Sequence, residues 1–258
     1  MPTRLLWAKD EMGAPIYWDL DPHTSGHLLV GGITGCGKSG VVNAIVGAAV
    51  RAGVKVTGLD PKRVELGLWR PALQNLATSS DDIEFVLQEF LVKMHQRYDE
   101  MEAARIRSWE GPAELLVVEE LANVFMVDLV ASSGDEKKAK IAAARRKGYL
   151  EELARMGRGA GFFILSATQE PSHDLISINF RNNHKYRWCG LTRGDTVSKM
   201  ILGDTFPGVE PWAKIKHPGV GYLLWDDARH LNIPLVRSIW WPDEAIAATV
   251  ERAVTRNG

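Results

Sequence analysis

Eight consecutive residues near the N-terminus have the types and spacing of a phosphate-binding loop. Residues 32–39 read Gly-Ile-Thr-Gly-Cys-Gly-Lys-Ser and match the pattern G-x-x-x-x-G-K-[ST]. In such a loop, glycines let backbone N–H groups turn toward phosphate oxygens, the lysine reaches the β- and γ-phosphates, and the hydroxyl binds Mg²⁺. The pattern predicts that Lys38 and Ser39 hold a nucleoside triphosphate and its magnesium ion.

The segments on either side of this loop are the ones that its chemistry requires. Residues 27–31 form a short apolar run typical of a buried strand, and residues 39–51 have the length and apolar spacing of a helix. Strand, loop and helix therefore present a helix N-terminus, with its partial positive charge, to the phosphates. Cys36 has no evident chemical task there beyond its backbone N–H. The residues expected to contact the nucleotide are Gly32, Thr34, Gly35, Cys36, Gly37, Lys38, Ser39 and Gly40.

An acidic pair follows a second fully apolar strand. Residues 115–118 are Leu-Leu-Val-Val, and Glu119 and Glu120 come directly after them. At a strand end, one carboxylate can hold Mg²⁺ through water while the next polarises the attacking water. We assign Glu119 to the metal side and Glu120 to the water; the alternative is a charged turn after a core strand.

Two further strand ends are expected at the same edge. Residues 162–167 form a third buried strand that ends in Thr168 and Gln169, whose uncharged side chains could sense the γ-phosphate. A purely structural role for such an amide is equally compatible with the sequence. Residues 60–66, Asp-Pro-Lys-Arg-Val-Glu-Leu, follow a strand at 54–59, and a solvated loop explains their charge equally well.

The composition suits one α/β domain of 258 residues, with 45% hydrophobic and 24% charged residues. A formal net charge of −1 neither indicates nor excludes nucleic acid as a partner. Two cysteines provide no disulfide framework and fit a reducing compartment. No apolar run approaches the roughly 18 to 20 residues of a membrane-spanning helix. The apolar stretch at the N-terminus is too short for a secretion signal. We therefore expect a soluble, cytoplasmic protein without membrane insertion.

Strand-like and helix-like segments alternate along the chain, which predicts a mostly parallel central sheet with helices on both faces. Long helices are expected at 81–107 and 137–158, and a closing helix at 243–254. The buried side of the first long helix is expected to carry Phe85, Val86, Phe90, Leu91 and Met94. Weaker strands are expected around Trp188, at 219–225 and at 231–240.

Taken in order, these segments resemble the motor domain of the FtsK/SpoIIIE family of DNA-pumping ATPases, in the wider FtsK and HerA group. The resemblance runs through HLLVGGITGCGKS (27–39), LDPKRVEL (59–66), VVEELA (117–122), LARMGRGAG (153–161) and LSATQEPS (165–172), and more loosely through 98–107. It implies a single RecA-like P-loop domain over 1–258, with lead-in strands at 1–26, the ATPase core at 27–190, and closing strands and a helix at 191–258.

The family's mode of action implies further roles. Its members form hexameric rings that thread double-stranded DNA and bind ATP between subunits, so the resemblance implies a homo-oligomer, with ATP and Mg²⁺ as cofactors. Glu120 would be the catalytic carboxylate and Gln169 the sensor. An arginine would act in trans on a neighbour's ATP, and we place it at Arg158, with Arg155 and Arg187 as alternatives.

The chain departs from the family pattern in three ways. Glu119 stands where the family usually has Asp, and Glu170 stands where A-T-Q-R-P has its arginine. The second variant is closer to the Tra-type translocases of mobile elements. The membrane-spanning region, linker and winged-helix reader of full-length division translocases are not found, so a free-standing motor encoded by a phage or mobile element is expected.

Basic residues gather between the acidic pair and the 153–161 segment. They are Lys137, Lys138, Lys140, Arg145, Arg146 and Lys147. Such a run is ordinarily a solvated helical face; alternatively it lines the ring channel, with Arg145, Arg146 and Lys147 on DNA phosphates. The nine tryptophans are scattered, which favours core and interface packing over base stacking.

Three functions are compatible with this sequence. The first is an ATP-driven translocase of double-stranded DNA that acts as a ring. The second is a coupling ATPase for conjugative DNA transfer or a secretion apparatus, with an unidentified transfer or packaging partner. The third is a nucleotide-binding assembly factor without turnover, for which Glu119 is the only indication.

Overall fold

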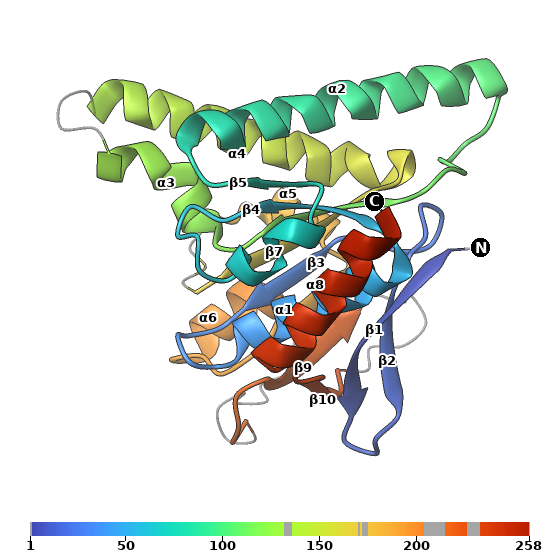
Figure 1. Ribbon diagram of the computed structural model, residues 1–258. Coiled ribbons are helices and arrows are strands. Elements are labelled where there is room, and N and C mark those ends of the chain that lie inside the picture. The colour runs from blue at the N-terminus through green and yellow to red at the C-terminus, as the bar shows by residue number, and fades with distance from the viewer. Residues whose placement is uncertain are drawn as a thin grey trace.

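A ten-stranded sheet runs through the computed structural model, which describes residues 2–131, 136–169, 171, 175–203, 215–225 and 233–257. The strand order is β2-β1-β10-β9-β8-β3-β7-β6-β4-β5 (Figure 1). The strands are β1 (Thr3–Asp10), β2 (Pro15–Leu20), β3 (Leu28–Gly31), β4 (Lys55–Leu59), β5 (Asn75–Ala77), β6 (Glu114–Val118), β7 (Phe162–Thr168), β8 (Tyr186–Cys189), β9 (Val220–Trp225) and β10 (Leu235–Ser238).

Six neighbouring strands, from β5 to β8, pair in parallel, and the remaining four pair antiparallel at one side. The helices are α1 (Lys38–Ala52), α2 (Ser80–Ala104), α3 (Leu121–Ala131), α4 (Glu136–Met156), α5 (Ile178–Asn183), α6 (Asp195–Leu202) and α8 (Asp243–Asn257), with short 3₁₀ turns η1 (Gly67–Ala72) and η2 (Gly157–Ala160). The predicted α/β class with a mostly parallel sheet is confirmed.

The apolar strands are apolar throughout because helices cover both faces of the sheet. Successive side chains of a strand point to opposite faces. In β6, Leu115 and Val117 therefore belong to the core under α1 and α8, whereas Leu116 and Val118 belong to the core under α2 and α4. A strand buried on both sides carries mostly apolar residues until it ends, and the polar residue inside β7, Ser166, has a hydrogen-bond partner in His184.

Helix α1 lies unusually close to the segment before α8. A Cβ atom on Gly47 would come within 2.5 Å of the Trp241 ring, so a larger residue there would push the two apart. The helix ends at Gly53, whose φ of 76° is left-handed and whose N–H reaches the carbonyls of Ala49 and Val50. Tight packing along α1 thus holds the C-terminal segment against the phosphate-loop helix.

Helix α2 begins one residue earlier and ends three residues earlier than predicted. The Ser79 hydroxyl accepts a hydrogen bond from the Asp82 N–H at the start, and Arg105 closes the end with a left-handed φ of 57°. The prediction that Phe85 lies on the buried side is wrong, because 59% of Phe85 is exposed. The buried stripe instead runs through Ile83, Val86, Leu87, Phe90, Met94 and Met101.

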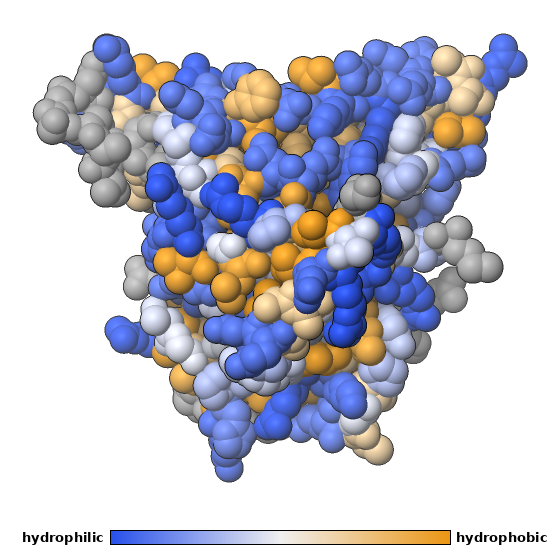
Figure 2. Space-filling model, viewed as in Figure 1, coloured by the Kyte–Doolittle hydropathy of each residue, from blue (hydrophilic) through white to orange (hydrophobic). Residues whose placement is uncertain are grey.

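The outer surface shows how the polar and apolar residues divide. Hydrophilic side chains cover most of the upper and lower margins of the face in Figure 2, and hydrophobic side chains gather across its middle. Four tryptophans, at positions 7, 18, 69 and 188, are almost completely buried, as the packing interpretation predicts, but Trp240 is not. No helix within the described ranges is both long and apolar enough to cross a membrane.

A pair of buried histidines joins α4, β7 and α5 beneath the parallel sheet. His27 Nδ1 accepts a hydrogen bond from the Ile164 N–H at 3.1 Å, so its Nε2 donates to the Ala154 carbonyl at 2.9 Å. His184 lies with its ring 5.5 Å from that of His27 and contacts Ser166 and the Phe180 carbonyl. Burial, together with the nearby Arg158 charge, lowers the pKa of His27 to about 4, and burial also lowers the pKa of His184.

These histidines make the fold sensitive to acid. The unfolded chain takes up protons near a pKa of about 6.5, whereas the folded chain resists them, so protons favour unfolding. The two histidines contribute stability that is fully present above about pH 7 and is lost as the pH drops from about 6.5 toward about 4, whereas Glu119, whose pKa burial raises to about 7, acts in the opposite sense between about pH 7 and about 4.5. Urea unfolding followed by circular dichroism at a series of pH values measures this slope.

The matched variant is His27→Gln, whose amide can still accept from Ile164 and donate to Ala154. The difference in slope between wild type and His27→Gln isolates the contribution of His27, because His184, Glu119 and Glu120 are present in both proteins. Identical slopes in the two proteins would show that His27 does not resist protonation.

Candidate functional site

The phosphate loop leaves the carboxyl end of β3 and enters α1 at Lys38. Its geometry demands glycine at position 37, where φ is 96° and a Cβ atom would lie 1.9 Å from the Gly219 nitrogen. The loop is braced from outside the motif, since the Ile33 N–H donates to the Leu191 carbonyl and the Gly219 N–H donates to the Cys36 carbonyl, both at 2.9 Å. The loops before α6 and before β9 therefore hold the loop in shape.

Lys38 and Cys36 are both buried within the loop. The Lys38 ammonium donates to the carbonyls of Gly32 at 2.7 Å and Ile33 at 3.1 Å, so its charge lies over the loop. The Cys36 N–H, which we expected to face phosphate, donates to the Ile33 carbonyl at 3.2 Å. Burial raises the pKa of the Cys36 thiol, so this thiol is neutral.

The acidic pair lies at the end of β6, where α3 begins immediately afterwards. Glu119 and Glu120 are both buried. Burial, with repulsion from Asp60, Glu65 and Glu120, raises the pKa of Glu119 to about 7, and burial also raises the pKa of Glu120. One oxygen of each carboxylate, Glu119 Oε2 and Glu120 Oε1, has no hydrogen-bond partner. Buried carboxylate oxygens in this state suit a cation or a bound water.

Gln169 connects the phosphate loop to the acidic pair. Its Oε1 accepts a hydrogen bond from the Thr34 hydroxyl at 2.8 Å, and its backbone N–H donates to Glu120 Oε2 at 2.8 Å. The connection is possible because β7 lies between β3 and β6 in the sheet. Three segments that are far apart in the sequence, ending β3, β6 and β7, are thus in contact.

The residues fit Mg²⁺ as a partly hydrated ion. Ser39 and Glu119 offer a hydroxyl and a carboxylate, and Mg²⁺ prefers oxygen ligands while keeping several waters or phosphate oxygens. In the part of the chain that the structure describes, no group of three or more His, Cys, Asp or Glu residues could hold a metal by itself. The assignment of Ser39 and Glu119 to the ion stays a prediction.

The 60–66 segment lies beside the acidic pair, and its first residue has a task that the sequence had not indicated. The fully buried Asp60 carboxylate accepts hydrogen bonds from the Arg63 N–H at 3.0 Å and the Leu66 N–H at 3.1 Å. The Glu119 N–H donates to the Leu59 carbonyl, which fixes β4 beside β6. Asp often forms turns by accepting hydrogen bonds from backbone N–H groups a few residues later. The position of Asp60 at the start of a charged loop is the sequence feature that could have predicted this role.

The three arginines considered as trans-acting differ in their surroundings. Arg158 lies in η2, before the amino end of β7, and therefore at the opposite end of the sheet from the phosphate loop. Its guanidinium lies near the carbonyls of Ser25 at 3.2 Å and His23 at 3.4 Å. Arg155 is exposed on α4, whereas Arg187 is buried and donates to two carbonyls of its own chain. Arg187 is thus a structural residue, and Arg158 stays a prediction.

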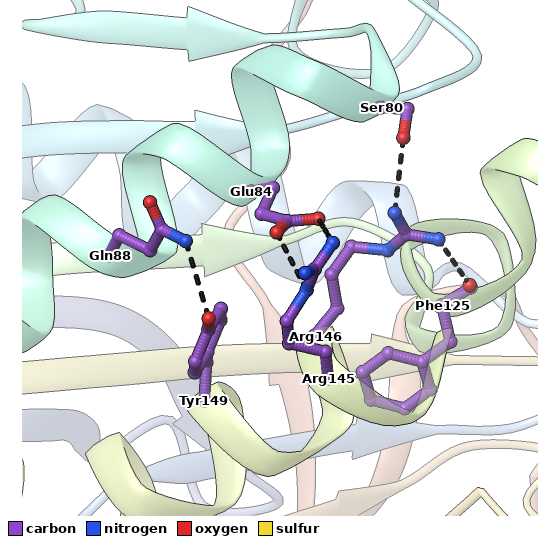
Figure 3. Close-up of polar contacts among 7 residues, drawn as sticks. All are labelled: Ser80, Glu84, Gln88, Phe125, Arg145, Arg146 and Tyr149. Carbon is purple, nitrogen blue, oxygen red and sulfur yellow. Dashed lines mark hydrogen bonds and ion pairs between the residues drawn. The ribbon is translucent and has the colours of Figure 1, made fainter. Parts of the chain in front are cut away.

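The basic cluster on α4 is largely engaged within the chain. Figure 3 shows Arg145 paired with Glu84 of α2, at 2.7 Å from Nε to Oε1. Arg146 is fully buried and donates to the Ser80 hydroxyl at 3.1 Å and to the Phe125 carbonyl at 2.8 Å. The prediction of Arg146 as a DNA contact is wrong, because its guanidinium joins α4 to α2 and α3. Lys147 is half-buried and stays a prediction.

A phosphate loop after one strand, a buried acidic pair after a second, and a polar strand end between them define a P-loop ATPase. The sequence model of the FtsK/SpoIIIE family matches residues 1–140, and the chain belongs to this family.

Two of the similar curated proteins are DNA translocases of bacteria. DNA translocase FtsK of Halalkalibacterium halodurans is 29% identical over 96% of this chain and 32% of its own length. DNA translocase FtsK of Oceanobacillus iheyensis is 30% identical over 78% of this chain and 27% of its own length. The chain spans about a third or less of these relatives.

Solved structures share the fold at lower identity. The pCW3 conjugation coupling protein TcpA with ATPγS is 18% identical, with a TM-score of 0.81, over 98% of this chain and 70% of its own. The cytoplasmic domain of the Type VII secretion ATPase EccC of Thermomonospora curvata is 19% identical, with a TM-score of 0.72. The match covers 97% of this chain and 31% of that chain.

The contrast between Arg145 and Arg146 is directly testable. Arg146→Met keeps the side-chain length but removes the donors to Phe125 and Ser80, and we expect it to lower the free energy of unfolding by roughly 2 to 4 kcal/mol. Arg145→Met removes only a half-exposed ion pair and should cost less than about 1 kcal/mol. Urea denaturation measures both, and equal losses would contradict the placement of these two side chains.

Proposed function

We propose that this chain is an ATP-driven motor that moves double-stranded DNA as a ring-shaped homo-oligomer, a hexamer. The observation that carries the proposal is the connected set Thr34, Gln169 and Glu120, which brings a water-activating carboxylate to a phosphate loop. The choice of DNA is supported by similarity to DNA translocases over 96% of the chain. A coupling or secretion ATPase with a transfer partner is the alternative, and either would work in the cytoplasm, where ATP is supplied.

The chemistry of this site would be hydrolysis with Glu120 as the water-positioning residue. One Glu120 oxygen is held by the Gln169 N–H, and the other has no partner and can accept a hydrogen bond from a water. Burial raises the pKa of Glu120, which makes the carboxylate a stronger base than an exposed one. Lys38 would turn from the Gly32 and Ile33 carbonyls to the β- and γ-phosphates when these enter the loop.

Ser39 and Glu119 would hold Mg²⁺, which neutralises charge that develops on the phosphates. Glu119 is one methylene longer than the Asp usual at this position, and burial in the acidic surroundings raises its pKa to about 7. A cation beside it would favour the ionised form. The third function compatible with the sequence is a nucleotide-binding assembly factor without turnover. It is disfavoured because the buried Glu119 Oε2 atom has no hydrogen-bond partner and is therefore available to a cation.

Gln169 would report the state of the nucleotide to the sheet. Its side-chain oxygen accepts from the Thr34 hydroxyl and its backbone N–H donates to Glu120. An incoming γ-phosphate would compete with that oxygen for the Thr34 hydroxyl and would accept a hydrogen bond from the Gln169 side-chain NH₂ group, which would shift both contacts. Arg158 would act on the ATP of a neighbouring subunit, since it lies at the end of the sheet opposite to the phosphate loop. In a ring, such opposite ends of successive subunits can face each other.

Duplex-stimulated turnover separates the motor from the other readings. We expect duplex DNA to raise ATPase activity, and Glu120→Gln to lower kcat by at least about 100-fold because the amide cannot act as a base. Glu102→Gln, the same change at an exposed position on α2, should leave kcat unchanged. A rate that is flat with every DNA tested would reject the DNA motor, and full activity of Glu120→Gln would reject the catalytic assignment.

A mixing experiment tests the shared site. Lys38→Ala and Arg158→Ala should each be inactive alone, the first without phosphate binding and the second without its trans-acting charge. Mixed together, they should regain part of the activity, because some sites combine Lys38 of one subunit with Arg158 of the next. Size-exclusion chromatography would confirm that the mixed proteins assemble into rings. If such mixed rings recovered no activity, Arg158 would be excluded as the trans-acting residue.

A further inference from the structure

Hydrolysis at the proposed site fixes the direction in which a bound triphosphate would lie. Hydrolysis requires the γ-phosphate to face Glu120 and Gln169, which lie on the β6 and β7 side of the loop. The first amides of α1, at Ser39 and Gly40, then contact the phosphate nearer the sugar. The nucleoside must therefore leave the loop beside Gly40, on the side away from Glu120.

The end of β10 lies at this exit. The Gly219 N–H donates to the Cys36 carbonyl, and the Ser238 N–H donates to the Gly219 carbonyl, each at 2.9 Å. The Ser238 hydroxyl lies 3.6 Å from where a Cβ atom on Gly40 would be. A chain of backbone contacts thus runs from the loop to the last residue of β10, beside the first turn of α1.

The two tryptophans that follow have opposite environments. Trp241 is buried against α1, with the Arg51 guanidinium 4.3 Å from its ring and the Trp69 ring 5.6 Å away. Trp240 is 76% exposed, the largest exposed fraction among the tryptophans that the structure describes. Packing explains Trp241, but it leaves the Trp240 ring without a function.

We propose that Trp240 is a stacking platform for the base of the bound nucleotide. This rests on the proposed function in taking a nucleoside triphosphate as the ligand, with its γ-phosphate toward Glu120; it does not rest on DNA as the substrate. An indole ring stacks on a nucleobase through its flat face and needs no hydrogen-bond match. Ser238, fixed beside Gly40, positions the segment that carries the ring, and Trp241 anchors it to α1 on the other side. The site would favour purines, because their two rings offer more stacking area.

Binding of two ligands tests the proposal without any need for turnover or DNA. Isothermal titration calorimetry with Mg²⁺ would compare ATP with inorganic tripolyphosphate, which has the phosphates but no sugar or base. We expect Trp240→Ala to weaken ATP binding by about tenfold. Trp240→Phe should retain most of the affinity, and binding of tripolyphosphate should be unchanged in both. Val92→Ala, at an exposed apolar position on α2, is the control and should bind both ligands normally.

The outcomes distinguish this proposal from the motor itself. Unchanged ATP affinity in Trp240→Ala would overturn the stacking role, as would an equal loss for tripolyphosphate, because that would indicate a disturbed loop. A wild-type protein that binds neither ligand would overturn both proposals. Selective loss of ATP binding in Trp240→Ala, in a wild type that DNA does not stimulate, would support the base site and reject the motor.

Discussion

The register between β3 and its neighbours is the constraint on which the site depends. Gly31 pairs with Thr168 of β7, and Ser166 of β7 pairs with Val118 of β6. Adjacent strands lie about 4.8 Å apart, so the loop after β3, the amide after β7 and the acids after β6 meet within a few side-chain lengths. A slip of one residue would exchange the side chains of β7 between the two cores, where their sizes would no longer match the helices packed on each face.

The same burial that holds the register also sets the chemistry. Glu119 and Glu120 are buried at the end of β6, which raises their pKa values, and one oxygen of each has no hydrogen-bond partner within the chain. Unpaired buried carboxylates weaken a fold unless a ligand or ion meets them. The site is therefore arranged for binding at some cost to stability, as is common where residues must act on a substrate.

Local sequence patterns predicted the central parallel strands β3, β4, β6 and β7, and β8 as a weaker strand, but not the short edge strand β5. The runs before Gly32 and Glu119 are apolar without interruption, and the run before Thr168 is broken only by Ser166. This pattern is the signature of strands covered on both faces, and the polar ends of the strands mark the site. The contact of Gln169 with both Thr34 and Glu120 agrees with the shared edge that these runs predict. The composition and periodicity of single segments carried this information.

The features that local sequence patterns did not predict depend on contacts between segments that are distant in the sequence. Arg146 has the sequence neighbours of a solvated helical face, yet packing of α2 and α3 over it makes it structural. Phe85 fits the apolar spacing of α2, but a neighbouring stripe of the helix faces the sheet. The pairing of β1 with β10, and the position of Ser238 beside Gly40, join the two ends of the chain. No window of sequence contains both partners.

The most direct measurement is a crystal structure of the protein with Mg²⁺ and a non-hydrolysable ATP analogue. The account predicts that Lys38 leaves the Gly32 carbonyl for the β- and γ-phosphates, and that Glu120 holds a water in line with the γ-phosphate. It also predicts that the Gln169 amide approaches the γ-phosphate. A nucleotide whose γ-phosphate points away from Glu120, or one bound outside the loop, would contradict it.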